Sequence, residues 1–417
     1  MPRIRIDGHR QLRGFIPISG AKNAVLKLMA AALMASGESV IHNVPHIQDV
    51  VTMIELLGTL GVGVEFNANT LRLSVGEEIG EEAPHELVRK MRASIQVMGP
   101  LLGRLGRVRV SLPGGCAIGE RPIDFHLKGL RQLGAKIWEE HGYIYAETDR
   151  LKGVDIQLDY PSVGATENLM MAATLAQGTT QIRNAAREPE IIETQNFLNQ
   201  MGARIRGAGT DVIRIDGVEG LHPAEHTTIP DRIEVGTYLV AAAMAGGKVT
   251  LHSVIPQHVA SLIAKLRETG VDIAVDEDRV TVHSNGRYRA VNFQSLPYPG
   301  FPTDLLPQVM AMMALAEGTS VIRETVYTNR YKHVGELVRM GANIIVADRT
   351  AVVQGVVHLT GAEVLVPDLR AGAALVLAAL VADGTTIIDD DDGHLGRGYD
   401  DLVGKLQAVG ADMFYVD

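Results

Sequence analysis

The sequence predicts an α/β fold of two domains, each assembled from three copies of a repeat of about 70 residues. The first observation is a recurring junction, in which an amphipathic segment ends at a glycine and an alternating strand follows. Glycine suits this place because it readily adopts the left-handed conformation that ends a helix. The junction occurs six times at spacings of 68 to 73 residues, at Gly61, Gly134, Gly202, Gly270, Gly341 and Gly410.

A second element recurs with the same period, a helix that is apolar on nearly all sides. Its copies are expected at 22–37, 92–106, 165–178, 232–247, 304–318 and 370–384. A helix without a polar face has to be buried. Six such helices therefore predict two groups of three, each with three sheets and outer helices wrapped around a three-helix core. A linear solenoid is the alternative that the repeat leaves open.

The domain boundary follows from the order of the repeats. The first three repeats give a domain of residues 22–229, which carries the only cysteine. The last repeat is short of strands after residue 411, whereas the N-terminal segment is strand-like and is expected to complete it. The second domain would then be discontinuous, with residues 1–21 plus 230–417. Ligands commonly bind between two such lobes.

Composition narrows the class of function. The formal charge of −10 disfavours nucleic acid or an anionic membrane as the main partner. No apolar run reaches the roughly 18 residues of a membrane span, and no signal peptide opens the chain. One cysteine excludes an internal disulfide and a cysteine-cluster zinc site. We expect a cytoplasmic protein with no metal, and its oligomeric state stays open.

Cys116 lies in a stretch, residues 111–126, that contains three glycines and two prolines. This composition predicts an exposed irregular loop. Arginines at 104, 107, 109 and 121 are near in sequence, and nearby cations activate a thiol as a nucleophile or acid. A small buried hydrophobe is the alternative role for a lone cysteine.

Each apolar helix begins with polar residues that a core does not need. Helix N-termini attract anions, and Lys22 and the basic residues around Arg92 add full charge there. Asp231 and Asp368 suit N-caps as well as functional roles. Asp304 is expected to act as a base if it faces the cations, and Arg397 stands between glycines in a flexible loop.

Together these stretches resemble the UDP-N-acetylglucosamine 1-carboxyvinyltransferases, the enolpyruvyl transferases that open peptidoglycan synthesis. The resemblance extends over essentially the whole chain in family order. Its most specific parts are the Pro-Gly-Gly-Cys loop and the Phe-Pro-Thr-Asp segment. The matching stretches are 20–24, 91–94, 112–116, 121–124, 162–166, 186–190, 301–304, 368–370 and 397–399.

The resemblance implies a two-domain inside-out α/β barrel that transfers the enolpyruvyl group of phosphoenolpyruvate to the 3′-hydroxyl of UDP-N-acetylglucosamine, without a cofactor. It implies that Asp304 takes the proton of the sugar hydroxyl. Cys116 would be a general acid or form a covalent adduct with phosphoenolpyruvate, and fosfomycin would label it. Phosphoenolpyruvate would be held by Lys22, Arg121 and Arg397, with Arg92 and Arg370 nearby. The acceptor would be bound by Asn23, Arg121, Pro122, Ile123, Asp124, Phe125, Ser162, Val163, Gly164 and Val326.

The chain departs from the family pattern in places. The family run is His-Ile-Asp-Arg-Gly-Tyr, whereas Gly396 here replaces the aspartate before Arg397. Residues 389–392 form an acidic run, and Pro307 falls in the first turns of the Asp304 helix. Alternative functions are an enolpyruvyl transferase for another uridine nucleotide or for shikimate 3-phosphate, and a silent nucleotide-binding regulator.

Overall fold

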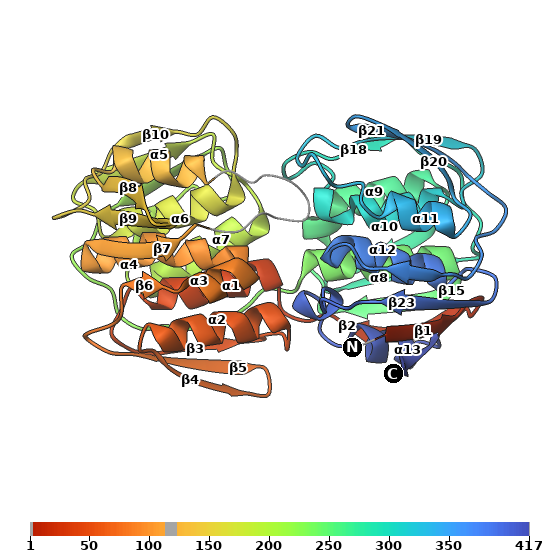
Figure 1. Ribbon diagram of the computed structural model, residues 1–417, viewed down its shortest axis with the longest axis horizontal. Coiled ribbons are helices and arrows are strands. Elements are labelled where there is room, and N and C mark those ends of the chain that lie inside the picture. The colour runs from red at the N-terminus through yellow and green to blue at the C-terminus, as the bar shows by residue number, and fades with distance from the viewer. Residues whose placement is uncertain (1–2, 113–122, 417) are drawn as a thin grey trace. The chain divides into compact units, whose positions relative to one another are not determined.

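The structure, a computed structural model, describes residues 3–112 and 123–416, which fall into two compact units. The first unit comprises residues 20–112 and 123–229, and the second comprises 3–19 and 230–416. Within these residues, each unit contains three four-stranded sheets around a core of apolar helices (Figure 1). The expected α/β architecture of inner helices and outer sheets is confirmed.

In the first unit the core helices are α1 (Lys22–Ala32), α4 (Met98–Leu105) and α6 (Val163–Thr174). The short helix η1 (Arg92–Val97) leads into α4. The outer helices are α2 (Gln48–Thr59), α3 (His85–Lys90), α5 (Asp124–Gln132) and α7 (Pro189–Gln200). The sheets have the orders β14-β3-β5-β4, β6-β7-β9-β8 and β10-β11-β13-β12. Their strands are β3 (Gly37–His42), β4 (Gly63–Asn67), β5 (Thr70–Val75), β6 (Glu82–Ala83), β7 (Arg107–Ser111), β8 (Lys136–Glu140), β9 (Tyr143–Glu147), β10 (Asp155–Gln157), β11 (Thr179–Arg183), β12 (Arg204–Arg206), β13 (Val212–Asp216) and β14 (Glu225–Thr227).

In the second unit the core helices are α8 (Arg232–Ala245), α10 (Leu306–Met313) and α12 (Leu369–Ala379). The other helices are η2 (Pro256–Val259), α9 (Ala260–Glu268), η3 (Thr303–Leu305), α11 (Val334–Arg339), η4 (Leu395–Arg397) and α13 (Leu402–Ala408). The sheets have the orders β22-β23-β1-β24, β16-β17-β15-β2 and β18-β19-β21-β20. Their strands are β1 (Arg3–Asp7), β2 (Leu12–Pro17), β15 (Gly247–His252), β16 (Asp272–Val275), β17 (Arg279–Ser284), β18 (Phe293–Gln294), β19 (Thr319–Arg323), β20 (Asn343–Ala347), β21 (Thr350–Gln354), β22 (Glu363–Leu365), β23 (Thr385–Asp389) and β24 (Asp412–Val416).

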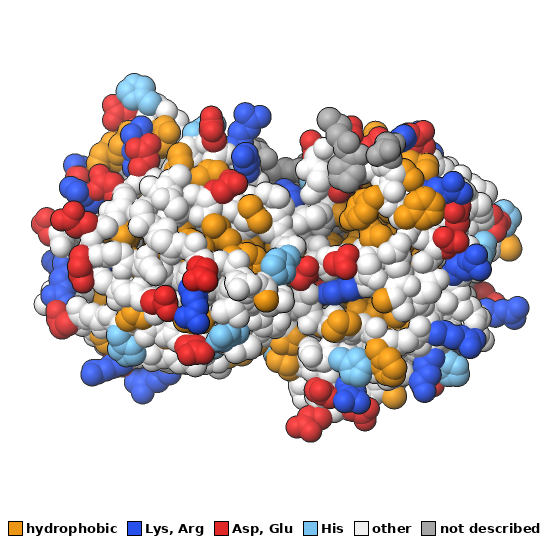
Figure 2. All heavy atoms as spheres, turned by 90° about the horizontal axis from the view of Figure 1, so that it is seen from below, with side chains coloured by type: hydrophobic (Ala, Val, Ile, Leu, Met, Phe, Trp, Pro, Cys, Tyr) orange, Lys and Arg blue, Asp and Glu red, His pale blue; other side chains and the backbone are white. Residues whose placement is uncertain are grey.

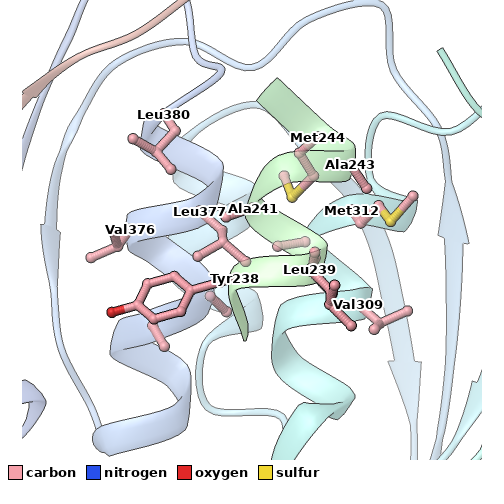
Figure 3. Close-up of a cluster of buried hydrophobic side chains, with 14 of the residues drawn as sticks. Tyr238, Leu239, Ala241, Ala243, Met244, Val309, Met312, Val376, Leu377 and Leu380 are labelled. Carbon is pink, nitrogen blue, oxygen red and sulfur yellow. The ribbon is translucent and has the colours of Figure 1, made fainter. Parts of the chain in front are cut away.

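The core of the second unit shows why its helices lack a polar face. Tyr238, Leu239, Met312 and Leu377 come from α8, α10 and α12 and gather in one buried cluster (Figure 3). Each of these side chains is fully removed from water, and a buried side chain of this size contributes about 1.5–3 kcal/mol. The predicted helix ranges run past the observed ends, because the turns that follow the helices are buried and apolar as well.

The repeat junctions have the expected backbone. All six glycines lie in the left-handed region, with φ between 86° at Gly61 and 105° at Gly410. A side chain there would be strained, which explains why the helix end and glycine recur together. Pro307 occupies the first turn of α10, where its missing N–H costs little. Among the described helices, none is both long and apolar enough to cross a bilayer.

The N-terminal segment serves two repeats. Strand β1 lies antiparallel between β23 and β24, so it completes the sixth repeat as expected and closes the unit on itself. This pairing of the first strand with the last excludes the linear solenoid. Strand β2 does not join the same sheet; it pairs in parallel with β15 of the fourth repeat.

The chain passes from one unit to the other twice, and at each of these two crossings a strand joins the sheet of a different repeat. In four sheets, the strand before a core helix pairs in parallel with the strand after it, as in β6–β7 and β10–β11. At the crossings, β2 precedes α1 but pairs with β15, whereas β14 precedes α8 but pairs with β3. Each unit therefore supplies its own edge strand, although the chain leaves between Ser19 and Gly20 and returns between Ile229 and Pro230.

Candidate active site

Asp304 lies between two arginines of the second unit. Arg330 Nη2 donates to Asp304 Oδ1 at 2.6 Å, and Arg370 Nη2 donates to Oδ2 at 3.2 Å. The arginine side chains are 1% and 5% exposed, whereas that of Asp304 is 25% exposed. The carboxylate is thus the part of the cluster that a ligand can reach. Two guanidinium groups at this distance favour its charged form.

The cluster is fixed by a second carboxylate, Glu324. Its Oε2 accepts a hydrogen bond from Thr303 Oγ1 at 2.8 Å, and the same hydroxyl accepts one from Arg330 Nε at 3.1 Å. Its Oε1 accepts hydrogen bonds from Ser295 Oγ and from the backbone N–H of Val326. Glu324 therefore ties the start of the Asp304 helix to the segment that carries Val326.

Arg370 occupies the first turn of α12, which Asp368 caps by accepting hydrogen bonds from two backbone N–H groups. Burial alone would lower the pKa of Arg370, but the Asp304 carboxylate raises it above its ordinary value. Its guanidinium lies 5.5 Å from the ring centre of Tyr399. Arg370 is therefore a permanent cation, and Asp368 and Asp231 both act as the N-caps that the sequence suggests.

The loop before α13 contains Arg397, which is half-buried in η4. Asp390 stabilises this loop, because its carboxylate accepts hydrogen bonds from the backbone N–H groups of His394 and Leu395 at 2.7 and 2.9 Å. Part of the unusual acidic run therefore has a structural task. At Gly396, a Cβ atom would meet no other atom within 4 Å, so the missing aspartate is not excluded by crowding.

In the first unit, Lys22 opens α1 and pairs with Asp49 in the first turn of α2. Lys22 Nζ lies 2.7 Å from Asp49 Oδ2, and the two side chains are 11% and 5% exposed. Asn23 is half-buried beside Lys22, and its carbonyl oxygen accepts a hydrogen bond from Lys27 Nζ at 2.6 Å. The pair fixes the direction of the Lys22 side chain at the helix N-terminus.

Lys27 also connects α1 to α6. Its Nζ lies 3.4 Å from Oε2 of Glu167, a side chain with no exposed surface. Burial raises the pKa of Glu167 to about 7, although the charge of Lys27 opposes this shift. Glu167 is thus a buried titratable group one helical turn from the predicted acceptor-binding residues.

The residues predicted to bind the acceptor lie at the starts of α5 and α6. Ser162 caps α6 by accepting a hydrogen bond from Ala165 N at 3.4 Å. A Cβ atom at Gly164 would lie 3.1 Å from Gln96 Nε2 and 3.3 Å from the His126 ring, so only glycine fits without displacement. His126 Nδ1 accepts a hydrogen bond from Asn168 Nδ2 at 2.9 Å, which joins the two helix starts.

At the start of α5, Asp124 is exposed, Phe125 is half-buried and Ile123 is 8% exposed. Val163 is half-buried next to Ser162. Cys116, Arg121 and Pro122 lie outside the described residues, and of Arg92 only the backbone position in η1 is described. Lys22, Asn23 and the residues of α5 and α6 belong to the first unit, whereas Asp304, Val326, Arg370 and Arg397 belong to the second.

Sequence reasoning missed Arg330 and Asp49, the partners of two predicted residues. Both stand seven residues after the strand that follows a core helix, β19 or β3. Glu190 holds the same place after β11 and is 3% exposed. A charged residue at this offset after β3, β11 and β19 is therefore a partial signal, since the equivalent place after β15 is the apolar Val259. The equivalent place after β23 is Gly396.

Each unit has charged groups at the starts of its core helices, Lys22 in the first unit and Asp304 with Arg370 in the second. Helix N-termini together with lysine and arginine bind anions. A carboxylate held by arginines can accept a proton from a hydroxyl when it is released from one of them. Each unit therefore offers groups that suit anion binding, and the second unit also offers a carboxylate that suits proton transfer.

The comparisons with known proteins agree with this architecture. The family model of EPSP synthase (3-phosphoshikimate 1-carboxyvinyltransferase) matches residues 6–406, and the chain belongs to this family. Within it, the chain is 57% identical to UDP-N-acetylglucosamine 1-carboxyvinyltransferase 1 of Symbiobacterium thermophilum, over 98% of this chain and 94% of that protein. It is 56% identical to the protein of the same name from Caldanaerobacter subterraneus, over 97% of each.

Solved structures show the same fold. The enolpyruvyl transferase NikO from Streptomyces tendae superposes with a TM-score of 0.90 and 28% sequence identity, over 100% of this chain and 99% of that one. EPSP synthase from Acinetobacter baumannii superposes with a TM-score of 0.77 over the full length of both chains. At 18% identity, the second likeness concerns the fold alone. The resemblance read from the sequence is therefore confirmed.

Proposed function

We propose that the chain transfers the enolpyruvyl group of phosphoenolpyruvate to the 3′-hydroxyl of UDP-N-acetylglucosamine and releases phosphate, the opening reaction of peptidoglycan synthesis. The bond between C2 of phosphoenolpyruvate and its phosphate oxygen breaks, and a bond between C2 and the sugar oxygen forms. The proposal is supported by relatives of that name that are 50% to 57% identical over nearly the whole chain. The alternatives of another acceptor or a silent regulator have no comparable support.

The observation that carries the proposal is the Asp304 carboxylate between Arg330 and Arg370. Asp304 accepts the proton of the sugar hydroxyl, while the arginines stabilise negative charge that develops on the reacting phosphoenolpyruvate. Lys22 adds positive charge from the start of α1 and Arg397 from the end of η4, and Arg92 and Arg121 are proposed to add positive charge as well. Guanidinium groups neutralise phosphate and carboxylate bidentately, so the residues suit this anion without a metal.

The acceptor nucleotide is assigned to the starts of α1, α5 and α6. Asn23 binds the sugar, and the first turn of α6, which includes Gly164, presents backbone N–H groups to the diphosphate. Cys116 delivers or stores a proton as an acid, or forms an adduct with phosphoenolpyruvate. The remaining acceptor contacts are assigned to Arg121, Pro122, Ile123, Asp124, Phe125, Val163 and Val326.

We assign these roles to two functional domains, residues 22–229 and residues 1–21 plus 230–417, and the reaction draws on groups from both. A cytoplasmic location follows from the proposed substrates, because phosphoenolpyruvate and nucleotide sugars are cytoplasmic metabolites.

The test is phosphate release on mixing the protein with phosphoenolpyruvate and UDP-N-acetylglucosamine. Asp304→Ala and Cys116→Ala are expected to lower kcat by at least about 100-fold, as loss of a positioned acid or base does. Asp392→Ala, which removes an exposed carboxylate of the acidic run, serves as the matched control and keeps full activity. Tight binding of the nucleotide without phosphate release at any pH from 5.5 to 9 would overturn the proposal.

A further inference from the structure

A hollow with a volume of about 610 Å³ lies over the sheet β16-β17-β15-β2 of the second unit. It is lined from three neighbouring strands and the turn after β17, with Arg13 and Phe15 on β2, Lys248 on β15 and His283 on β17. None of the residues assigned to enolpyruvyl transfer lines it. Ligand sites have volumes of about 300–1,000 Å³, so the hollow is large enough for a nucleotide.

Three basic side chains form a row across this sheet. Lys248 is paired in register with Arg13 on one side and with His283 on the other. Strands lie about 4.8 Å apart, so the three groups start within about 10 Å of one another. All three side chains are exposed. On the face drawn in Figure 2, acidic and basic side chains are interspersed. The row Arg13, Lys248 and His283 differs from that face because it contains basic side chains alone.

Few carboxylates neutralise the positive charge of this row. Arg13 donates a hydrogen bond to the neutral amide of Gln11, and His283 lies 4.0 Å from the exposed Asp272. Within the described residues, neither Arg13 nor Lys248 forms an ion pair with a carboxylate. Arg13 and Lys248 are directly opposite on neighbouring strands, and like charges in this position destabilise a sheet. An anion with two or more negative charges would remove this repulsion.

An aromatic wall stands beside the row. Phe15 follows Arg13 by two residues and therefore lies on the same face of β2, about 7 Å away along the strand. Its side chain is 66% exposed and lies against His252, with ring centres 5.0 Å apart. Its register partner Thr250 adds a hydroxyl to the lining of the hollow. An exposed ring beside a cation row offers a stacking surface for a planar base.

We propose that this hollow binds a nucleoside diphosphate, with the phosphates on Arg13, Lys248 and His283 and the base on Phe15. The distance between the cation row and the ring matches a ribose between diphosphate and base. This site is independent of the enolpyruvyl transfer assigned above, because it shares no residue with it.

The test is calorimetric titration of the full chain with ADP, pyrophosphate and adenosine at low ionic strength. ADP is expected to bind most tightly and pyrophosphate more weakly. The double variant Arg13→Glu/Lys248→Glu should bind ADP and pyrophosphate at least tenfold more weakly, since two favourable charges become repulsive. Phe15→Ala should lower the affinity for ADP several-fold and leave the affinity for pyrophosphate unchanged. None of these exposed positions supports the core, so folding is retained.

The matched control is Arg279→Glu. It reverses an exposed charge on β17, the strand that also carries His283, but at a position outside the hollow. It should leave the affinity for ADP unchanged within twofold. The proposal is overturned if ADP does not bind at millimolar concentration. It is also overturned if the double variant keeps its affinity, or if the control loses as much affinity as the double variant. The rate of phosphate release from phosphoenolpyruvate should be the same in all four proteins without ADP.

Discussion

Lys405 Nζ lies 2.6 Å from Glu234 Oε1, and the two side chains are only 13% and 3% exposed. The pair also holds Ser19, whose hydroxyl accepts a hydrogen bond from Lys405 Nζ and whose backbone N–H donates to Glu234 Oε2 at 2.8 Å. Ser19 O accepts in turn from Asp231 N at 2.9 Å. Ser19 is the last residue before the chain enters the first unit, and Asp231 follows its return. One buried ion pair thus anchors both crossings to the second unit.

Lys405→Met is expected to destabilise the protein by about 3 kcal/mol, because removal of one partner leaves the other charge buried and unpaired. Lys405→Met/Glu234→Leu should recover part of this loss, since the unpaired charge is gone. Urea unfolding of each variant measures the change. Lys265→Met is the control, because its pair with Glu268 has a similar distance of 2.7 Å but is exposed, and it should cost less than about 0.5 kcal/mol. Equal losses in the buried and exposed pairs would contradict the anchoring role.

Arg330→Lys is expected to lower kcat by about 10- to 100-fold, the size of effect that a small misplacement of a reacting group produces. Arg330 uses two nitrogens to hold Thr303 and Asp304 together, and a lysine cannot reproduce this fork. Steady-state kinetics and the pH profile of kcat measure the effect. Arg349→Lys is the control, because in the part of the chain that the structure describes the Arg349 side chain donates only to the backbone oxygen of Thr325 in the neighbouring segment. An unchanged pH profile with a proportionate loss of stability would indicate a purely structural role for Arg330.

Gly396→Asp is expected to lower the KM for phosphoenolpyruvate several-fold by giving Arg397 an adjacent carboxylate that orders its loop. The open space around Gly396 accommodates the side chain, so stability should change by less than about 0.5 kcal/mol. Gly393→Asp brings the same charge into the loop, but at a φ of 63°, and should be less stable without improving KM. A KM that is unchanged in Gly396→Asp would show that Asp390 already orders the loop sufficiently.

The fold could be predicted because each repeat is marked by local sequence features. Each helix end needs a left-handed glycine, and each core helix needs apolar residues on all sides. The exchange of β2 and β14 could not be predicted, because parallel pairing between strands more than 180 residues apart leaves no local pattern. Likewise, the charge of Lys22 and Asp304 was visible in the sequence, whereas their buried partners Asp49 and Arg330 depend on tertiary packing.

Glu167→Gln is expected to flatten the pH dependence of stability. The pKa of Glu167 is raised from 4.5 to about 7 in the folded chain, so between these values the folded state binds a proton that the unfolded state releases. Stability from this group is therefore fully present below about pH 4.5 and declines as the pH rises to about 7. At about 1.4 kcal/mol for each pKa unit, the decline amounts to roughly 3 kcal/mol.

Urea unfolding at pH 5, 6, 7 and 8 measures this difference between the wild-type protein and Glu167→Gln. Glu234 titrates in the same direction, since burial raises its pKa to about 7 despite Lys405, but it is present in both proteins and cancels. The loss of the Lys27 partner lowers the stability of the variant at high pH, so the informative quantity is the slope between pH 5 and 7. Glu219→Gln, at a side chain 89% exposed, should keep the wild-type slope. Parallel curves for the wild-type protein and Glu167→Gln would mean that Glu167 ionises in the fold at its ordinary pH, with Lys27 offsetting the cost of burial.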